Sequence, residues 1–384
     1  QGKDNLMQSK LADTGTSIFT IMSKMAADFG AINLSQGYPG FDISPELVER
    51  VNFYMKKGYN QYAPMPGLPQ LRQIISDKVH QTHGWHTNAD DHITVTSGAT
   101  EAIFATITAL VHDGDEVIYF EPAYDSYHPA VLLNKGVPVP VQLSFPDFSI
   151  PWEQVEKKIS NKTKMIIINT PQNPSGAILS KSDVERLAEL IKNKDIFVLS
   201  DEVYEHIIFD DAKHHSVLSN EYLREKSIGV FSFGKTFHAT GWKMGYSVAS
   251  KKITEEIKKI HQFLVFSVNT PIQFAMTDYL QNPEHYYSLP AFFQSKRDLF
   301  LALMKNSRFE PLKSSGTYFQ TFSYKEISNE PDTLVAEKFT KEYGVASIPF
   351  SVFYQDRTDN KLLRFCFAKD EESLIKAAEI LCKI

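Results

Sequence analysis

The sequence has little cysteine, no long apolar run and no excess of either charge, and each of these absences excludes a class of protein. Its only two cysteines in 384 residues, Cys366 and Cys382, form no CxxC motif and lie far from any pair of histidines. This usage excludes a disulfide framework and a structural zinc, and it is typical of reduced thiols in the cytoplasm. No apolar run reaches the roughly 18–20 residues that a membrane-spanning helix needs, so we expect no membrane association. The opening Gln1-Gly2-Lys3-Asp4 is polar, and we therefore expect no signal peptide.

The charge balance argues against a nucleic acid as partner. Forty Lys and Arg residues stand against 46 Asp and Glu residues, a formal net charge of −6, with no dense basic stripe. A phosphate backbone is bound through clustered cations, which this chain lacks. The twelve histidines are scattered and form no convincing ligand set, so we predict no metal site. With 42% hydrophobic residues, the length predicts two or three domains with a large core.

Between residues 93 and 250, short apolar runs alternate with helix-like segments. The runs are Ile93–Thr96, Val117–Phe120, Met165–Ile168, Ile196–Leu199, Ile228–Phe233 and Tyr246–Ala249. Several are apolar on both faces, as parallel strands covered by helices would be. Ser182 with Glu185 has the spacing of a capping box and predicts the start of one intervening helix. We therefore predict an α/β fold whose large domain contains a mainly parallel, doubly wound sheet.

The pattern changes after Pro271, where we expect a second, smaller α/β domain. Helix-like stretches at Pro290–Met304 and Thr333–Tyr343 flank the shorter apolar runs Thr317–Phe322 and Leu362–Phe367. Near the start, Ile18–Ala27 is the one candidate for an amphipathic helix. The prediction divides the chain into an N-terminal arm with part of the small domain (1–40), a large domain (41–280) and a C-terminal small domain (281–384).

Lys235 is a candidate nucleophile. It follows an apolar strand and precedes a stretch with little helical character that contains Gly241 and Gly245. A lysine at a strand's end near the interior loses part of its charge through burial, and a neutral amine can attack a carbonyl group. An exposed loop lysine is the ordinary alternative.

Asp201 lies at the end of the next candidate strand, Ile196–Ser200. Open α/β sheets bind ligands at the carboxyl ends of their parallel strands. A carboxylate there could pair with a protonated heteroaromatic nitrogen, and Tyr204 could donate a hydrogen bond to a phenolic oxygen of the same ring. A helix N-cap is the alternative role for Asp201.

Two turns complete the pattern of candidate ligand-binding residues. Asn169-Thr-Pro-Gln-Asn173-Pro-Ser-Gly176 bends the chain as it leaves a strand, so that Asn173 could point its amide at a ligand or simply form the turn. Thr96-Ser-Gly-Ala99-Thr100-Glu101 joins a strand to an apolar helix, and free backbone N–H groups at a helix start can bind phosphate. Many strand–helix turns look alike, so this second signal is weak alone.

The order of these pieces resembles the fold-type-I pyridoxal-phosphate aminotransferases of class I, over essentially the whole chain. Further matching motifs are Asn33-Leu-Ser-Gln-Gly37-Tyr-Pro39, Tyr62-x-Pro-x-x-Gly67 and Leu363-Arg364-Phe365. Many class I members carry Arg where this chain has Lys243. The stretches Gly234-Lys-Thr-Phe-x-Ala-Thr-Gly-Trp-Lys243 and Phe266-Ser-Val-Asn-Thr-Pro271 are most similar to the bacterial methionine aminotransferases and the glutamine–kynurenine aminotransferase branch.

The resemblance implies which residues would bind the cofactor ring and carry out catalysis. Lys235 would hold pyridoxal 5'-phosphate as a Schiff base and act as the base that moves the proton. Asp201 would pair with the pyridinium nitrogen, Tyr204 and Asn173 would hydrogen-bond the ring's O3′, and Tyr124 would stack on the ring. The family also places cis peptide bonds before prolines that correspond to Pro122 and Pro174.

The resemblance also implies how phosphate and substrate are held. The phosphate contacts would come from Ala99, Thr100, Ser232, Lys243 and Tyr62, the last reaching over from the second subunit of a homodimer. Arg364 would grip the substrate α-carboxylate with help from Gly37 and Asn173, a geometry that suits an Arg fork. Phe19, Tyr38 and Phe266 would line a pocket for an apolar or aromatic side chain, although plain core packing is the alternative for aromatic residues.

The implied activity is a ping-pong transfer of the amino group of methionine to a 2-oxo acid, with glutamine, aromatic amino acids and kynurenine as further donors. Its partners would be these small molecules, with no nucleic acid and no membrane, in a cytoplasmic homodimer whose active site lies at the subunit interface. A carbon–sulfur β-lyase is the closest alternative, because the same cofactor chemistry can expel a β-leaving group.

A nucleotide-binding ATPase is the alternative from a different class. Gly229–Thr236 matches the P-loop pattern GxxxxGK[ST]. A P-loop needs small or polar residues in its loop and a helix directly afterwards. Here Val230, Phe231 and Phe233 resemble buried strand, and the segment after Thr236 is a poor helix, which argues against this alternative.

Overall fold

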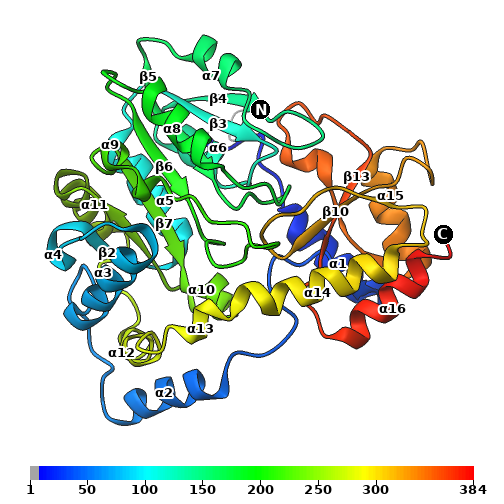
Figure 1. The fold of residues 1–384 in the computed structure, drawn as a ribbon, viewed down its shortest axis with the longest axis horizontal. Helices are drawn as coiled ribbons and strands as arrows, with labels where there is room; N and C mark the ends of the chain where they lie inside the picture. The colour runs from blue at the N-terminus through cyan, green and yellow to red at the C-terminus, as the bar shows by residue number, and fades with distance from the viewer. Residues whose placement is uncertain (1–7) are drawn as a thin grey trace, which may run out of the picture.

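The computed structural model describes residues 8–384, so the opening segment on which the signal-peptide prediction rests lies outside the described residues. A seven-stranded sheet dominates the structure (Figure 1). Its strands are β2 (Ile93–Thr96), β3 (Glu116–Glu121), β4 (Val137–Gln142), β5 (Thr163–Asn169), β6 (Phe197–Asp201), β7 (Ser227–Ser232) and β8 (Gly245–Ala249), in the order β2-β8-β7-β6-β5-β3-β4. Only β8 runs antiparallel to its neighbours, which confirms the mainly parallel sheet.

Helices cover both faces of this sheet because its strands are apolar on both sides. Successive side chains of a strand point to opposite faces. In β5, Met165 and Ile167 pack into one core with helices α5 (Gly98–Leu110), α6 (Tyr127–Leu133) and α11 (Lys251–Leu264). Ile166 and Ile168 pack into a second core with α3 (Pro69–His83) and α8 (Lys181–Leu190). The sheet is therefore doubly wound.

One strand of the large sheet and the start of one helix beside it differ from the sequence-based expectation. Strand β4 was not expected, because its sequence Val-Pro-Val-Pro-Val-Gln contains two prolines; it lies at the sheet edge, where a missing N–H is tolerated. The predicted cap of α8 was wrong by two residues. The cap is formed by Ser180 and Asp183, which have the same spacing, and the indole N–H of Trp152 also donates to Asp183.

A second sheet and its helices lie beside the first (Figure 1). Its antiparallel strands are β9 (Glu310–Pro311), β10 (Phe319–Ser323), β12 (Ile348–Pro349) and β13 (Leu362–Cys366), in the order β12-β13-β10-β9. The predicted helix near the start is confirmed as α1 (Ile18–Phe29). The short strand β1 (Ile32–Asn33) pairs with β11 (Val345–Ala346), so the N-terminal segment packs with the C-terminal elements.

The remaining helices connect or cover these two sheets. They are α2 (Pro45–Lys56), α4 (Ala89–His92), α7 (Trp152–Lys158), α9 (Glu221–Arg224), α10 (Phe233–Thr236), α12 (Thr270–Tyr279), α13 (Glu284–Tyr287), α14 (Leu289–Met304), α15 (Asp332–Lys338) and α16 (Glu371–Leu381). Helix α14, yellow in Figure 1, runs from the large sheet toward the C-terminal elements and packs against α16. Among residues 8–384, no helix is long and apolar enough to cross a membrane.

The structure excludes the P-loop interpretation of Gly229–Thr236. Strand β7 runs through Ser232, and Val230 and Phe231 are buried within it. Helix α10 is a single turn that ends at Thr236. The segment therefore forms neither the loop nor the long helix that cradles a nucleotide phosphate.

Candidate active site

The candidate site lies where the central parallel strands end. Strands β5, β6 and β7 are neighbours, and their last residues are Asn169, Asp201 and Ser232. One cavity opens at these ends, and it is lined by Ala99, Thr100, Ile103, Tyr124, Asn169, Asn173, Asp201, Val203, Tyr204, Ser232, Lys235, Thr240 and Lys243. The structure thus brings together every expected cofactor-binding residue except Tyr62.

Lys235 reaches into this cavity from the single turn α10. The Ser232 side chain caps that turn by accepting a hydrogen bond from the Lys235 N–H at 3.4 Å. Lys235 Nζ donates to the Gly37 carbonyl oxygen at 2.8 Å and lies 3.4 Å from Tyr318 Oη. Burial, assisted by the nearby Arg364 charge, lowers the pKa of Lys235 to about 8. A substantial share of its amine is therefore neutral near neutral pH.

Asp201 offers a carboxylate on the floor of the cavity and is only 4% exposed. Its Oδ2 accepts a hydrogen bond from the Tyr127 hydroxyl at 2.6 Å, and its Oδ1 accepts one from the Val203 N–H at 3.4 Å. Burial raises the pKa of Asp201 to about 6, and the Tyr127 hydrogen bond opposes that rise. The chain after Asp201 forms turns, so the helix-cap alternative does not apply.

Tyr204 and Tyr124 place two aromatic rings in the same cavity. Lys235 Nζ lies 5.7 Å from the centre of the Tyr204 ring. Burial raises the pKa of Tyr204, and it raises the pKa of Tyr124 to about 12, so both hydroxyls keep their protons and can donate hydrogen bonds.

Arg364 on β13 lies next to the cavity, in contact with its lining residue Asn173, and is fully buried. Its Nη1 donates to Asn173 Oδ1 at 2.6 Å, and its guanidinium lies 3.8 Å from the centre of the Phe319 ring. Its Nε has no hydrogen-bond partner among the described residues. Burial lowers the pKa of Arg364 to about 10, so the group stays charged at neutral pH. A buried guanidinium with spare donors can hold a carboxylate.

An anion cradle lies at the start of α5. Gly98 has φ +71°, and a Cβ there would lie 2.9 Å from Lys243 Nζ. A Cβ at Gly245 would lie 2.9 Å from the Ala99 nitrogen. The two glycines therefore let the Lys243 ammonium and the free N–H groups of the helix start approach the same point, as phosphate binding requires.

The donor set as a whole fits pyridoxal 5'-phosphate. The partly neutral amine of Lys235 suits the aldehyde, the Asp201 carboxylate suits the ring nitrogen, and the cradle at Gly98 suits the phosphate. The unpartnered Nε of Arg364 leaves a donor for a carboxylate. Fold and site together define the class of a pyridoxal-phosphate enzyme that acts on amino acids.

The other expected residues lie at or beyond the rim. Phe19 lies 5.3 Å from the Arg364 guanidinium, as measured to its ring centre, and the Gly37 carbonyl accepts from Lys235. Tyr38 and Phe266 are half exposed, and Tyr62 is 83% exposed with its ring edge against Phe266. Tyr62 does not reach the cavity of its own chain.

Three residues of the site had not been assigned a role. Tyr127 donates to Asp201, and Tyr318 donates to the Gly37 carbonyl at 2.9 Å. Asn169 donates through Nδ2 to the Asp201 backbone carbonyl and accepts from the Asn173 N–H. Asn169 stood inside a recognised turn motif, whereas nothing local distinguishes the two tyrosines among the 17 of the chain.

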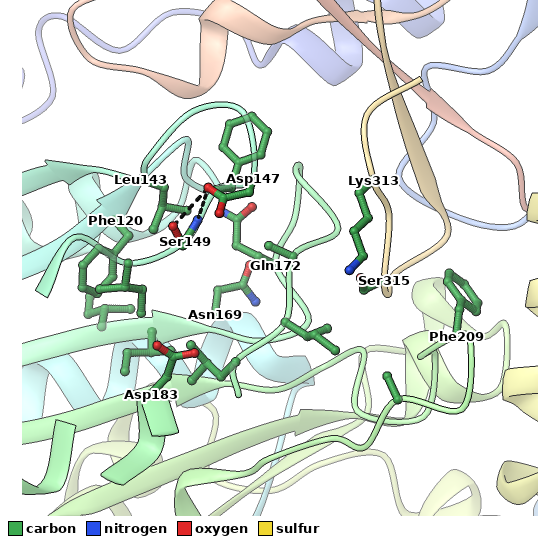
Figure 2. Close-up of a pocket in the computed structure, with 18 of the residues that line it drawn as sticks. Phe120, Leu143, Asp147, Ser149, Asn169, Gln172, Asp183, Phe209, Lys313 and Ser315 are labelled. Carbon is green, nitrogen blue, oxygen red and sulfur yellow. Dashed lines mark hydrogen bonds between the residues drawn. The ribbon is translucent and has the colours of Figure 1, made fainter. Parts of the chain in front are cut away.

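A larger cavity of about 380 Å³ lies beside this site, and Asn169 lines both (Figure 2). Its carboxylates already accept hydrogen bonds from protein groups: Asp147 from Ser149, Asp183 from Trp152, and Asp210 from Arg297. The exposed Lys313 extends along its edge. The larger cavity therefore lacks Lys235 and Asp201, which line the smaller one.

Comparisons with known proteins agree with the class that the site defines. The family model for class I and II aminotransferases matches residues 30–381. The methionine aminotransferase of Escherichia coli K12 is 48% identical over 375 residues, which cover 97% of each chain. The crystal structure of YbdL from Escherichia coli, identified as having a methionine aminotransferase function, matches with a TM-score of 0.97 and 48% identity over 99% of this chain and 100% of that one.

A more distant relative has a related activity. The kynurenine–oxoglutarate transaminase of Dictyostelium discoideum is 33% identical over 411 aligned positions, 96% of this chain and 94% of that protein. The chain belongs to the class I and II aminotransferases. It is a pyridoxal-phosphate-dependent transferase that acts on amino acids and 2-oxo acids.

Proposed function

We propose that this aminotransferase takes the amino group of methionine and passes it to a 2-oxo acid in two half-reactions, with glutamine, aromatic amino acids and kynurenine as further donors. The observation that carries the proposal is the single cavity that joins Lys235, Asp201 and Asn173, with Arg364 bonded to Asn173 beside it. The 48% identity to a methionine aminotransferase supports the donor. The kynurenine relative supports the further donors.

The surroundings of Arg364 support an uncharged donor side chain. Phe19 and Phe353 each lie 5.3 Å from its guanidinium, so apolar rings stand beside the position of the substrate carboxylate. Among residues 8–384, the side chains that line the cavity include no arginine, and Arg364 beside it is assigned to the α-carboxylate, so no further arginine is placed to hold a second, distal carboxylate. A donor such as aspartate therefore fits less well than methionine.

In the proposed mechanism, the residues of this chain bind, orient and move a proton. Pyridoxal phosphate, when bound, supplies an aldehyde and an electron-withdrawing ring. Lys235 would provide the amine that bonds the cofactor and would serve as the base that removes and returns the substrate α-proton. Arg364 holds the substrate α-carboxylate in a bidentate grip, and Asn173 orients Arg364.

The polar residues around the ring have separate tasks in this proposal. Asp201 keeps a negative charge beside the ring nitrogen, and Tyr127 supports that charge through its hydrogen bond. Tyr204 and Asn173 would hydrogen-bond the ring's phenolic oxygen, and Tyr124 would stack on the ring. Ala99, Thr100, Ser232 and Lys243 would hold the phosphate.

The proposal includes a cytoplasmic homodimer in which Tyr62 reaches the phosphate of the partner's site, with Gly37 and Tyr38 at the substrate entrance. The exposure of Tyr62, Phe263 and Phe266 supports a subunit interface there. Two free cysteines support a reducing compartment. We also propose a division into an arm (1–40), a large domain (41–280) and a small domain (281–384), supported by the separation of the seven-stranded and four-stranded sheets.

The test is a panel of amino donors with the purified holoenzyme and a fixed 2-oxo acid acceptor. Methionine should give the highest kcat/KM and yield its 2-oxo acid by mass spectrometry, and Lys235→Ala should abolish turnover. A preference for aspartate would contradict the proposed donor. Release of pyruvate from cysteine conjugates faster than transamination would favour the β-lyase instead.

A further inference from the structure

A buried bridge of two side chains connects the start of α5 with the segment that carries Tyr62. Glu101, in the first turn of α5, is 8% exposed, and His261, in the last turn of α11, is fully buried. Glu101 Oε1 lies 2.6 Å from His261 Nδ1, and His261 Nε2 lies 2.8 Å from the Met65 carbonyl oxygen. A carbonyl oxygen only accepts, so His261 Nε2 donates to Met65.

The other carboxylate oxygen of Glu101 holds the turn that enters the cavity. Oε2 accepts a hydrogen bond from the Ser97 N–H at 2.6 Å. Ser97 is the N-cap of α5, and its own side chain makes no capping hydrogen bond. The carboxylate of Glu101 therefore caps the Ser97 N–H, and the next residues of this turn, Ala99 and Thr100, line the cavity.

The carboxylate of Glu101 would repel a phosphate at the start of α5 if it faced the cavity, and the hydrogen bond to His261 helps to hold it in another direction. A carboxylate in the first turn of a helix stabilises the helix, but it repels a phosphate bound at the same helix end. Glu101 is turned away from the cavity, toward Ser97 and the ring of His261. Hydrogen bonding to both of these groups fixes the carboxylate in that direction.

At the far end of the bridge, hydrogen bonds hold the chain on both sides of Tyr62. Ser267 Oγ donates to the Ala63 carbonyl at 2.9 Å, and Thr270 Oγ1 donates to the Gln61 carbonyl at 2.6 Å. These bonds tie the segment to the chain that follows α11. His261 adds the connection from this segment to Glu101, and through it to the turn at Ser97.

We propose that Glu101 and His261 are positioning residues of the phosphate subsite, which hold the Ser97–Thr100 turn and the Tyr62–Met65 segment in register. This inference rests on the proposed function, because it takes the cofactor phosphate to bind at that turn. Two consequences follow. Loss of Glu101 should reduce the part of the cofactor affinity that the phosphate contributes, and loss of His261 should displace Tyr62.

The first experiment compares two ligands that differ only in the phosphate. Apoprotein is titrated with pyridoxal 5'-phosphate and with pyridoxal, and the dissociation constants are read from absorbance. Glu101→Leu should weaken pyridoxal phosphate binding about 10-fold or more, as expected for the loss of a charge-assisted hydrogen bond, and should leave pyridoxal binding within about twofold. Glu101→Gln, which keeps an acceptor for Ser97, should recover most of the loss.

The control is Glu121→Gln, which alters another buried carboxyl group, one bonded to Tyr119 and the Gln355 N–H rather than to Ser97 or His261. It should leave the ratio of the two dissociation constants unchanged. If Glu101→Leu changes both ligands equally or neither, the inference is overturned. If wild-type protein fails to bind pyridoxal phosphate at all, the proposed function fails instead.

The second experiment separates the two ends of the bridge at His261. Asn places a nitrogen where histidine has Nδ1, and Gln places one where histidine has Nε2. His261→Asn should therefore retain phosphate selectivity and weaken the dimer, whereas His261→Gln should lower selectivity and retain the dimer. Equal effects of the two variants on both the selectivity and the dimer dissociation constant would contradict the bridge.

Discussion

The lowered pKa of Lys235 gives a prediction that can be worked out from the structure. Burial is the main cause, and the Arg364 guanidinium is the second. The ordinary value is 10.5, and the value in this site is about 8. At about pH 7.5, roughly a quarter of the Lys235 amines are then neutral, against roughly 0.1% for an unperturbed lysine, a gain of about 200-fold in the reactive form.

Competitive acetylation of the apoprotein measures this gain. Labelling with acetic anhydride from about pH 6 to about pH 11, followed by mass spectrometry, compares Lys235 with the exposed lysines of the same chain. Reactivity of Lys235 should rise about tenfold per pH unit and level off above pH 8. Because folding favours the neutral amine, the charged form destabilises the fold at low pH, and this cost disappears as pH rises from about 8 toward 10.5.

A substitution at Arg364 tests the assigned cause. Arg364→Gln removes a positive charge that lowers the pKa, so the midpoint for Lys235 should move upward. Arg186→Gln is the control, because Arg186 lies on the surface and pairs with Glu156. A wild-type midpoint near 10.5 would refute the reasoning, and an unchanged midpoint in Arg364→Gln would remove Arg364 as a cause.

Three further predictions follow from hydrogen bonds and ion pairs of the structure. Tyr127→Phe removes the donor to Asp201, so the pKa of Asp201 should rise above about 6 by roughly 1–2 units, shifting the acid limb of the kcat/KM profile to higher pH. Lys78→Met leaves the buried Glu205 without its ammonium partner and should cost about 3–5 kcal/mol in urea unfolding near neutral pH. Arg364→Lys replaces a bidentate donor and should raise the methionine KM about tenfold or more, with the cofactor spectrum unchanged.

Each of these outcomes has a clear opposite. An unshifted acid limb would show that the Tyr127 hydroxyl does not support Asp201. The destabilisation by Lys78→Met should shrink as pH falls, because Glu205 has a lowered pKa and contributes its stability only while ionised; a pH-independent loss would contradict the ion pair. An unchanged KM in Arg364→Lys would argue against the carboxylate role.

Strands with continuous apolar runs were predictable, and Ile93–Thr96 was predicted with the bounds that β2 has. Local sequence failed where a tertiary position overrides it. Strand β4 contains Pro138 and Pro140, which only an edge position tolerates. The site residues at strand ends were predictable for a geometric reason, since the carboxyl ends of parallel strands converge.

The parts of the site that sequence could not predict depend on contacts between distant segments. Tyr318 meets the Gly37 carbonyl across 281 positions of sequence, and Tyr127 meets Asp201 across 74. No local pattern contains either contact. Tyr62 is exposed on its own chain, so its expected role depends on a second subunit rather than on the fold of one.

An absorbance spectrum of the purified protein before and after addition of methionine tests the central claim most directly. We predict a cofactor band at roughly 360–430 nm that falls as a band near ~330 nm grows, because the amino group passes to the cofactor. In Lys235→Ala, the covalent bond between the protein and the cofactor should not form, because the amine is missing. A protein that shows no band even after incubation with pyridoxal phosphate would contradict the account.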